Sequence, residues 1–159
     1  DPSGSLLIFY EWFKTFNDND KIKIFFLYGE ACNYIETINK IPKLSNISFV
    51  PFSENIIKEA DIALCAFGVT LYELVYLNIQ TISFGHTLMH AQASKRFCER
   101  YKCTIDLGLL ADIDKDMFYE NLDSLINNFQ KRKLLFENSL NLVDGKGVER
   151  FVKILENVC

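Results

Sequence analysis

Residues 60–75, ADIALCAFGVTLYELV, contain the junction that decides the fold. The apolar run at 61–66 has the length and composition of a buried strand, and it stops at Phe67 and Gly68. Apolar residues at helical spacing follow at once, so the stretch predicts a strand that passes through one glycine into a helix. Such a junction is either an ordinary turn of an α/β protein or a place where backbone amides meet phosphate oxygens.

The same alternation runs along the rest of the chain. Apolar runs bounded by turn residues predict five strands, at 21–29, 46–52, 61–66, 80–85 and 103–108. Segments with helical spacing predict helices at 1–16, 30–41, 53–60, 69–78, 90–101, 115–127, 130–137 and 148–157. Strands that alternate with helices form parallel crossover units, so the expected fold is α/β, a doubly wound parallel sheet of the Rossmann-like type.

The chain opens on a helix, whereas a fold of this type normally opens on a strand. Asp1 has the residue type of a helix N-cap, and Pro2 has that of the first helical position. In the common strand order the first strand lies in the middle of the sheet, so its loss would leave a gap. We therefore expect residues 1–159 to be one α/β domain of a longer polypeptide, cut just after its first strand.

Composition excludes several classes of function. The 159 residues are 49% hydrophobic and carry a formal net charge of −4, with no lysine- or arginine-rich cluster, so a nucleic-acid partner is not expected. No apolar run approaches the roughly 20 residues that span a bilayer. No cleavable signal is visible either, and the sequence therefore predicts a soluble, cytoplasmic domain without a transmembrane segment.

The cysteines and histidines do not form a metal pattern. Five cysteines, an odd number, are spread through apolar segments without a C-x-x-C pair, which predicts reduced thiols. His86 and His90 are spaced i, i+4 in HTLMH, but the intervening glutamate of a zinc helix and a third ligand are both missing. We expect no metal and no cofactor, and we interpret the two histidines as polar residues near a ligand.

The junction after residue 66 is the best candidate for a ligand site. Ligands of open α/β sheets bind beyond the carboxyl ends of the strands, where helix N-termini present unpaired amides. Gly68 would let the backbone turn and a ligand approach, and Thr70 would cap the helix or donate to a phosphate oxygen. Glu73, one turn on, would accept hydrogen bonds from a ribose diol. The alternative is that Gly68 ends a strand, Thr70 only caps, and Glu73 is solvated.

Four stretches carry a resemblance to a known family: DPSGSLLIFYEWF, ADIALCAFGVTLYELVYLNIQTISF, AQASKRFCERYKCTIDLG and DGKGVERFVKIL. In this order they resemble landmarks of the C-terminal half of the UDP-sugar hydrolases of the pseudaminic acid pathway and the related spore-coat polysaccharide protein G group. These families belong to the GT-B superfamily. The D-G-x-G-x-x-R element is a fairly specific marker, formed here by Asp144, Gly145, Gly147 and Arg150. Family members also carry Gly-Gly-Ser/Thr before the Asp-Pro that begins this chain.

The resemblance implies a nucleotide-sugar site shared by two domains. The C-terminal domain would grip UDP or a UDP-sugar, with Gly68, Val69 and Thr70 along the diphosphate and Glu73 on the ribose. The segment FGHTLMHAQ would border the sugar-phosphate region, and Gln92 matches the glutamine of an Asn-Gln pair. The missing N-terminal domain of the same polypeptide would supply the acceptor contacts and the catalytic histidine.

Two departures from the family bear on activity. Ala66 and Phe67 stand where the family has consecutive glycines, which predicts a bulkier phosphate loop. Ala91 replaces the asparagine expected before the glutamine, and His90, one place earlier, is the candidate to compensate and to contribute to catalysis. A general base is otherwise unknown, so the chain alone is expected to bind a uridine nucleotide weakly and to turn over nothing.

Two alternatives stay open. The first is the donor-binding domain of a GT-B glycosyltransferase, which only the sequence upstream of Asp1 would separate from a hydrolase. The second is a non-catalytic α/β interaction module, which an exposed aromatic patch including Phe9 or Trp12 would favour. Core packing against the sheet is the favoured interpretation of those two aromatic residues.

Overall fold

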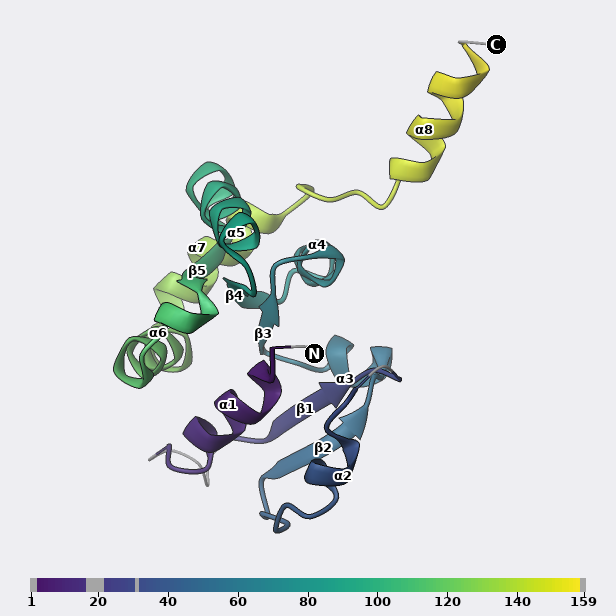
Figure 1. Cartoon of the computed structure of the whole chain (residues 1–159). Coiled ribbons are helices and arrows are strands. Elements are labelled where there is room, and N and C mark those ends of the chain that lie inside the picture. The colour runs from purple at the N-terminus through teal and green to yellow at the C-terminus, as the bar shows by residue number, and fades with distance from the viewer. Residues whose placement is uncertain (1–2, 17–21, 31, 158–159) are drawn as a thin grey trace. The chain divides into compact units, whose positions relative to one another are not determined.

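The computed structural model describes residues 3–16, 22–30 and 32–157 (Figure 1). Its contacts divide the chain into two compact units. The first comprises Asp1–Ala60 with Asp114–Tyr119, and the second comprises Asp61–Ile113 with Glu120–Cys159. Each unit has a parallel sheet of its own, and the two are described separately below.

The first unit is built on a two-stranded parallel sheet. Strand β1 (Ile24–Tyr28) pairs with β2 (Ile47–Pro51) in a register that places Ile24 opposite Ile47. Three helices belong to the same unit: α1 (Ser5–Phe13), α2 (Ile35–Ile38) and α3 (Glu54–Lys58).

Aromatic rings form the core of the first unit. Phe118 is fully buried, and its ring lies 5.2 Å from that of Phe9 and 5.5 Å from that of Trp12. Phe26 stacks on Phe49 across the strand pair, with 5.0 Å between ring centroids. Phe9 and Trp12 therefore pack in the core, as expected, and they do not form the exposed patch that an interaction module would present.

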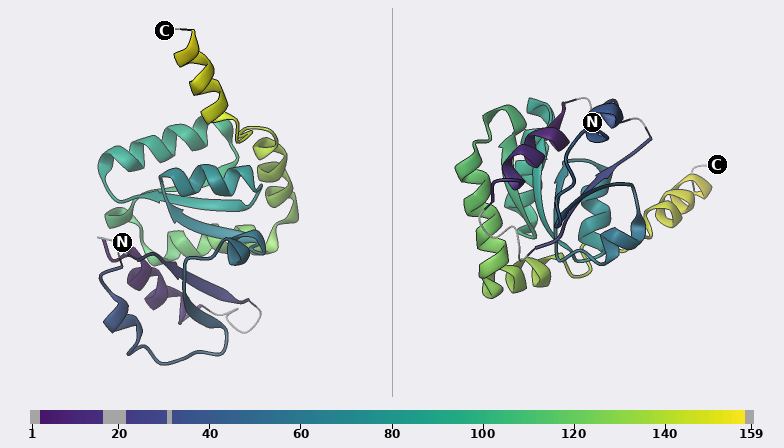
Figure 2. Two further views of the ribbon diagram at one scale, coloured as in Figure 1. Left: turned by 90° about the vertical axis from the view of Figure 1, so that its right-hand side faces the viewer. Right: turned by 90° about the horizontal axis from the view of Figure 1, so that it is seen from below.

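The second unit is built on a three-stranded parallel sheet in the order β3-β4-β5. The strands are β3 (Ile62–Ala66), β4 (Gln80–Gly85) and β5 (Thr104–Leu109), followed by a short 3-10 turn at Leu110–Asp112. The helices are α4 (Val69–Tyr76), α5 (Leu88–Tyr101), most of α6 (Lys115–Asn127), α7 (Phe129–Ser139) and α8 (Gly147–Glu156). Figure 2 shows α4 and α5 along one face of this sheet and α6 and α7 along the other.

The second core lies where α4 and α5 cover the sheet. Leu71 and Val75 on α4 are buried with Phe97 of α5 and Cys103, which directly precedes β5. Their spacing of four residues on α4 places both side chains on one helical face. The central strand β4 is buried from Thr81 to Gly85, because it is paired on both edges and covered by helices.

The expected fold class is confirmed, since all strand pairs are parallel and helices flank the sheets. Two expectations need correction. The strands form two sheets and not one, since β1 and β3 are not paired with each other. The sequence pattern did not predict this, because it does not specify which strands are neighbours. The helix expected at 30–41 is reduced to Ile35–Ile38.

The first helix also starts later than expected. Helix α1 begins at Ser5, and Gly4, with φ 67°, is its N-cap. The predicted cap at Asp1 and Pro2 lies outside the described residues. In the part of the chain that the structure describes, no helix combines the length and the apolar character needed to cross a bilayer.

Candidate functional site

Two strand–helix junctions lie side by side at the carboxyl edge of the sheet in the second unit. Strand β3 leads through Phe67 and Gly68 into α4, and β4 leads through Gly85 into α5. The two strands are paired up to Ala66 and Phe84, and the Phe67 amide donates to the Phe84 carbonyl over 2.7 Å. Both helices therefore begin at the edge where ligands of open α/β sheets bind.

The start of α4 is open. Gly68 is the N-cap, and a Cβ added there would meet nothing within 4 Å. The first backbone hydrogen bond runs from Leu71 N to Gly68 O over 3.1 Å, so the amides of Val69 and Thr70 precede the bonded turns. Val69 is 75% exposed. These two amides and the positive end of the helix dipole are available to an anion.

Gly68 is not needed for its conformation. Its φ is 173°, an extended value that any residue adopts, so the bend between β3 and α4 does not require glycine. The open space in front of it is the property that a ligand could use.

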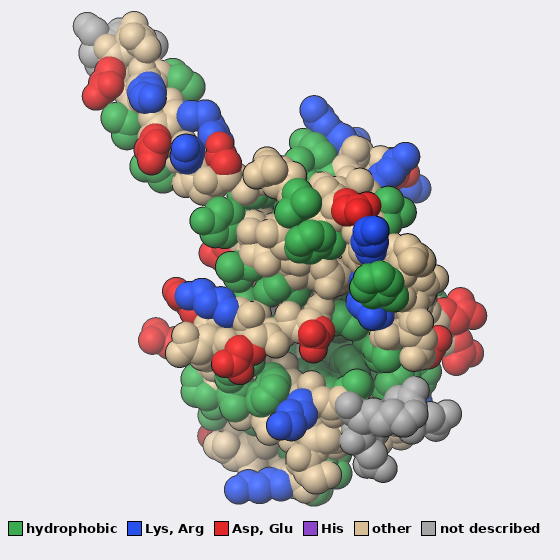
Figure 3. Space-filling view, turned by 180° about the vertical axis from the view of Figure 1, so that it is seen from behind, with side chains coloured by type: hydrophobic (Ala, Val, Ile, Leu, Met, Phe, Trp, Pro, Cys, Tyr) green, Lys and Arg blue, Asp and Glu red, His purple; other side chains and the backbone are tan. Residues whose placement is uncertain are grey.

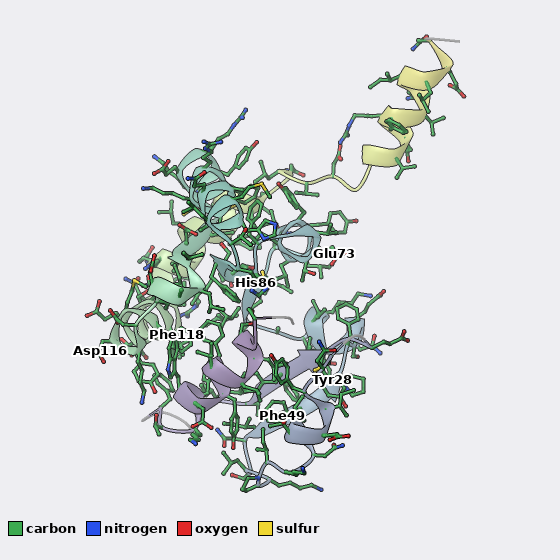
Figure 4. The ribbon with its side chains drawn as sticks, in the orientation of Figure 1. Tyr28, Phe49, Glu73, His86, Asp116 and Phe118 are labelled. Carbon is green, nitrogen blue, oxygen red and sulfur yellow. The ribbon has the colours of Figure 1, made fainter. Side chains whose placement is uncertain are left out.

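The bulk of Phe67 lies in the core. Its ring packs 6.3 Å from Phe97 and 6.2 Å from Tyr72, measured between centroids. The residue is partly buried against the Leu71 cluster, so the ring belongs to the packing between α4 and α5. Glu73, one turn further along α4, is exposed on the outer side of the helix (Figure 4).

The glycine before α5 is tightly packed by protein atoms. A Cβ on Gly85 would lie 2.5 Å from the Ala91 Cα and 2.7 Å from the His90 carbonyl carbon, so only glycine fits under the helix. The Thr87 hydroxyl accepts from the His90 amide over 3.3 Å and caps the helix. The amides of Leu88 and Met89 precede this bond, so the two helix starts differ in the crowding at the glycine and not in the number of free amides.

The two histidines occupy different environments at this junction. His86 lies edge-on to Phe84, with 5.4 Å between ring centroids. The pKa of its imidazole is lowered mainly by burial and further by the charge of His90. His90 is half-buried, and its Nδ1 is buried without a hydrogen-bond partner among the described residues. Gln92, in the second turn of α5, is exposed.

A buried polar network, which sequence reasoning missed, holds α5 on the sheet. Ser94 donates to Asp106 Oδ1 over 2.5 Å, and its hydroxyl lies 2.9 Å from that of Ser83. Ser83 and Ser94 are fully buried, and Ser83 also donates to the Ile105 carbonyl over 3.3 Å. The available signal was a serine between the apolar residues Ile82 and Phe84 of the strand, and a second serine one turn after His90.

Burial makes Cys65 and Cys103 poor nucleophiles. Cys32, Cys65, Cys98 and Cys103 are free thiols, and Cys159 lies outside the described residues. Burial raises the pKa of the Cys65 thiol to about 12 and that of Cys103 to about 11, so both stay protonated at neutral pH. Within the described ranges, no group of three or more His, Cys, Asp or Glu side chains has metal-binding geometry.

The D-G-x-G-x-x-R element forms a turn that opens α8. Asp144 accepts from the Lys146 amide over 3.0 Å and from Arg150 Nη1 over 2.6 Å. The hydrogen bond from Arg150 is the main reason that the pKa of Asp144 falls to about 2. Gly145, with φ 72°, lies beside the Tyr76 ring of α4. The element therefore acts locally, on the segment that joins α7 to α8.

All six residues proposed from the sequence lie in the second unit. Gly68, Val69, Thr70 and Glu73 belong to the junction of β3 with α4, and His90 and Gln92 lie in the first two turns of α5. The pairing of β3 with β4 places the two helix starts at neighbouring strand ends. Whether these residues bind a common ligand stays a prediction.

The fold and the two junctions define an α/β protein with parallel sheets of the Rossmann-like type. The chain is 25% identical over 137 residues, 84% of its length, to the spore coat polysaccharide biosynthesis protein SpsG of Bacillus subtilis strain 168. The chain spans 40% of that protein's length. No protein-family model and no solved structure matches the chain. The similarity links the chain to a protein named for polysaccharide biosynthesis.

Proposed function

We propose that this chain is the nucleotide-binding half of a UDP-sugar hydrolase that acts in the biosynthesis of an unusual cell-surface sugar of the pseudaminic acid type. The observation that carries the proposal is the open start of α4, where the Val69 and Thr70 amides precede the first bonded turn. The similarity of the chain to a protein named for spore coat polysaccharide biosynthesis supports the same class of pathway. A cytoplasmic location, where nucleotide sugars are consumed, is part of the proposal.

The proposed roles follow from charge and position. A diphosphate carries negative charge that the amides of Val69 and Thr70 and the helix dipole stabilise, and the Thr70 hydroxyl adds one more donor. Glu73 lies about one helical turn, roughly 5.4 Å, further along the axis. That separation suits a carboxylate that accepts hydrogen bonds from a ribose diol while the phosphates stay at the helix start.

The reaction itself requires more than this chain supplies. His90 and Gln92 border the proposed sugar-phosphate region, and His90 is the candidate contributor to catalysis. In this proposal a preceding N-terminal domain provides the acceptor contacts and the catalytic histidine, in keeping with the 40% coverage of the longer relative. The chain alone then binds UDP and hydrolyses no UDP-sugar.

Titration calorimetry with UDP tests the site. Glu73→Ala removes the ribose contacts, so we expect the Kd to rise about tenfold or more, because hydrogen bonds to a charged group contribute roughly 1.5–3 kcal/mol. Glu99→Ala, an exposed glutamate further along α5, is the matched control and leaves the Kd unchanged. Equal Kd values for Glu73→Ala and the unaltered chain, or no heat of binding at all, would overturn the proposal.

A further inference from the structure

Helix α8 presents an apolar face that the structure leaves exposed. Val148, Phe151, Val152 and Leu155 recur at the spacing of one helical face, and Val148 is 76% exposed and Phe151 60%. No described residue of α8 is buried, and charged residues alternate with these side chains along the helix (Figure 3). A helix of this length is marginal in water by itself, so it needs a surface to pack against.

A second exposed apolar stripe lies on α4. Val69, Tyr72 and Tyr76 follow each other at i, i+3 and i+7 and are 75%, 42% and 53% exposed. The other apolar side of the helix, formed by Leu71, Leu74 and Val75, is buried toward the sheet. The outer stripe of α4 is therefore a helix-length apolar surface within the same unit as α8.

The segment before α8 already contacts one end of that stripe. A Cβ on Gly145 would lie 3.5 Å from the Tyr76 ring, so the chain passes over the C-terminal end of α4 just before α8 begins. Gly145 has φ 72° and Asn141 has φ 60°, which gives the connection two left-handed positions where its direction turns. A helix that starts beside Tyr76 and returns along α4 would run antiparallel to it, toward Val69.

The two stripes match in spacing. Going from Tyr76 back to Val69, the steps along α4 are four and then three residues, and going from Val148 through Val152 to Leu155 the steps along α8 are also four and three. Side chains at such steps lie on one face, so two antiparallel helices can pack along the whole of both stripes. Self-association through α8 alone is disfavoured, because a pair of ten-residue helices buries less than the roughly 1,200 Å² of a stable interface.

We propose that α8 folds back onto α4 as an antiparallel helix pair, with Val148 against Tyr76, Val152 against Tyr72 and Leu155 against Val69. The exposed apolar face of α8 then belongs to the undocked state. Docking covers Val69 at the start of α4, so α8 and the nucleotide compete for that helix start. This second part rests on the proposed function, whereas the docking itself does not.

Disulfide trapping in the full chain tests the docking. The pair Val69→Cys with Leu155→Cys joins the ends farthest from the connection, and the control pair Val69→Cys with Lys153→Cys places the second thiol on the charged face. Under mild oxidation, with the bond mapped on non-reduced peptides, we expect about fivefold more of the first disulfide than of the control, at a yield independent of protein concentration. Equal yields, or a yield that rises with protein concentration, overturn the docking.

Hydrogen exchange in the unaltered chain tests the competition. With UDP at saturation we expect the α8 amides to exchange about threefold faster than without it, because the nucleotide displaces α8 from α4. If the disulfide between α4 and α8 forms but UDP does not change the exchange of the α8 amides, the docking is supported and the competition is overturned. If calorimetry shows no UDP binding, the proposed function fails, and the disulfide yields still decide whether α8 docks.

Discussion

The two strand–glycine–helix junctions of the second unit use the same sequence pattern in opposite ways. At the end of β4, Gly85 lets α5 pack directly over the strand, and the Thr87 hydroxyl caps the helix. At the end of β3, Gly68 has open space in front of it, and no side chain caps α4. The glycine of one junction is packed against the following helix, and the glycine of the other faces open space.

The difference teaches that a glycine before a helix does not by itself indicate a binding site. The sequence suggested that glycine at position 68 is needed for a close approach of the backbone. In the structure it is Gly85 that is needed in this way, because the backbone of α5 lies directly against it. What distinguishes the candidate site is the open space beside Gly68, and the substitutions below sharpen or break that contrast.

The largest expected effect is that of Gly85→Ala. The new methyl group would overlap the backbone of Ala91 and His90, so α5 must shift away from the sheet. We expect a loss of about 3 kcal/mol in the free energy of unfolding, at the upper end for overpacking, measured by urea denaturation.

Gly68→Ala is the matched control, because its methyl group enters open space at an extended backbone position. Its free energy of unfolding should stay within about 0.5 kcal/mol of the unaltered protein. Similar losses for both variants would contradict the distinction between a closed and an open junction.

A smaller effect is expected from Ser94→Ala, which breaks the network that fixes α5. The substitution leaves an Asp106 carboxylate oxygen without its 2.5 Å donor, so the expected loss is about 1–3 kcal/mol in the free energy of unfolding. Thr70→Ala, the corresponding hydroxyl deletion at the open junction, should cost less than about 0.5 kcal/mol in stability and should instead weaken UDP binding. The reverse ranking of the two variants in urea denaturation would show that the polar network does not anchor α5.

The smallest expected effect is a pH dependence from His86, beside Gly85. Its pKa lies below the ordinary 6.5 when folded, chiefly because of burial, so the unfolded chain binds the proton first as pH falls. Stability should therefore be fully present above pH 6.5 and decline as the pH drops from 6.5 toward the folded pKa.

Urea unfolding at pH 7.5 and pH 5.0 measures this change, in a range above the titration of ordinary carboxylates. His86→Gln removes the titrating group and should flatten the dependence. An identical pH dependence in the variant and the unaltered protein would assign the effect to another group.

Local patterns predicted most elements well, and the reason is physical. Strand β3 is a short apolar run followed by glycine, and α6, predicted at 115–127, is amphipathic over its full length, so the local pattern defines both. The segment 30–41 carried a weak helical pattern without a cap, and only four of its described residues are helical. Within each unit, strands that follow each other in the chain are paired in the sheet, as expected for consecutive parallel strands.

The sequence by itself determined the α/β class, the parallel strands and the position of α4 after Gly68, because hydrophobic periodicity and turn residues act over a few neighbouring positions. Only the tertiary structure decided which glycine is crowded, which helix start is capped, that Phe67 turns into the core, and that Ser94 meets Asp106. Those outcomes depend on atoms that are distant in the chain and close in space, and no local pattern encodes such distances.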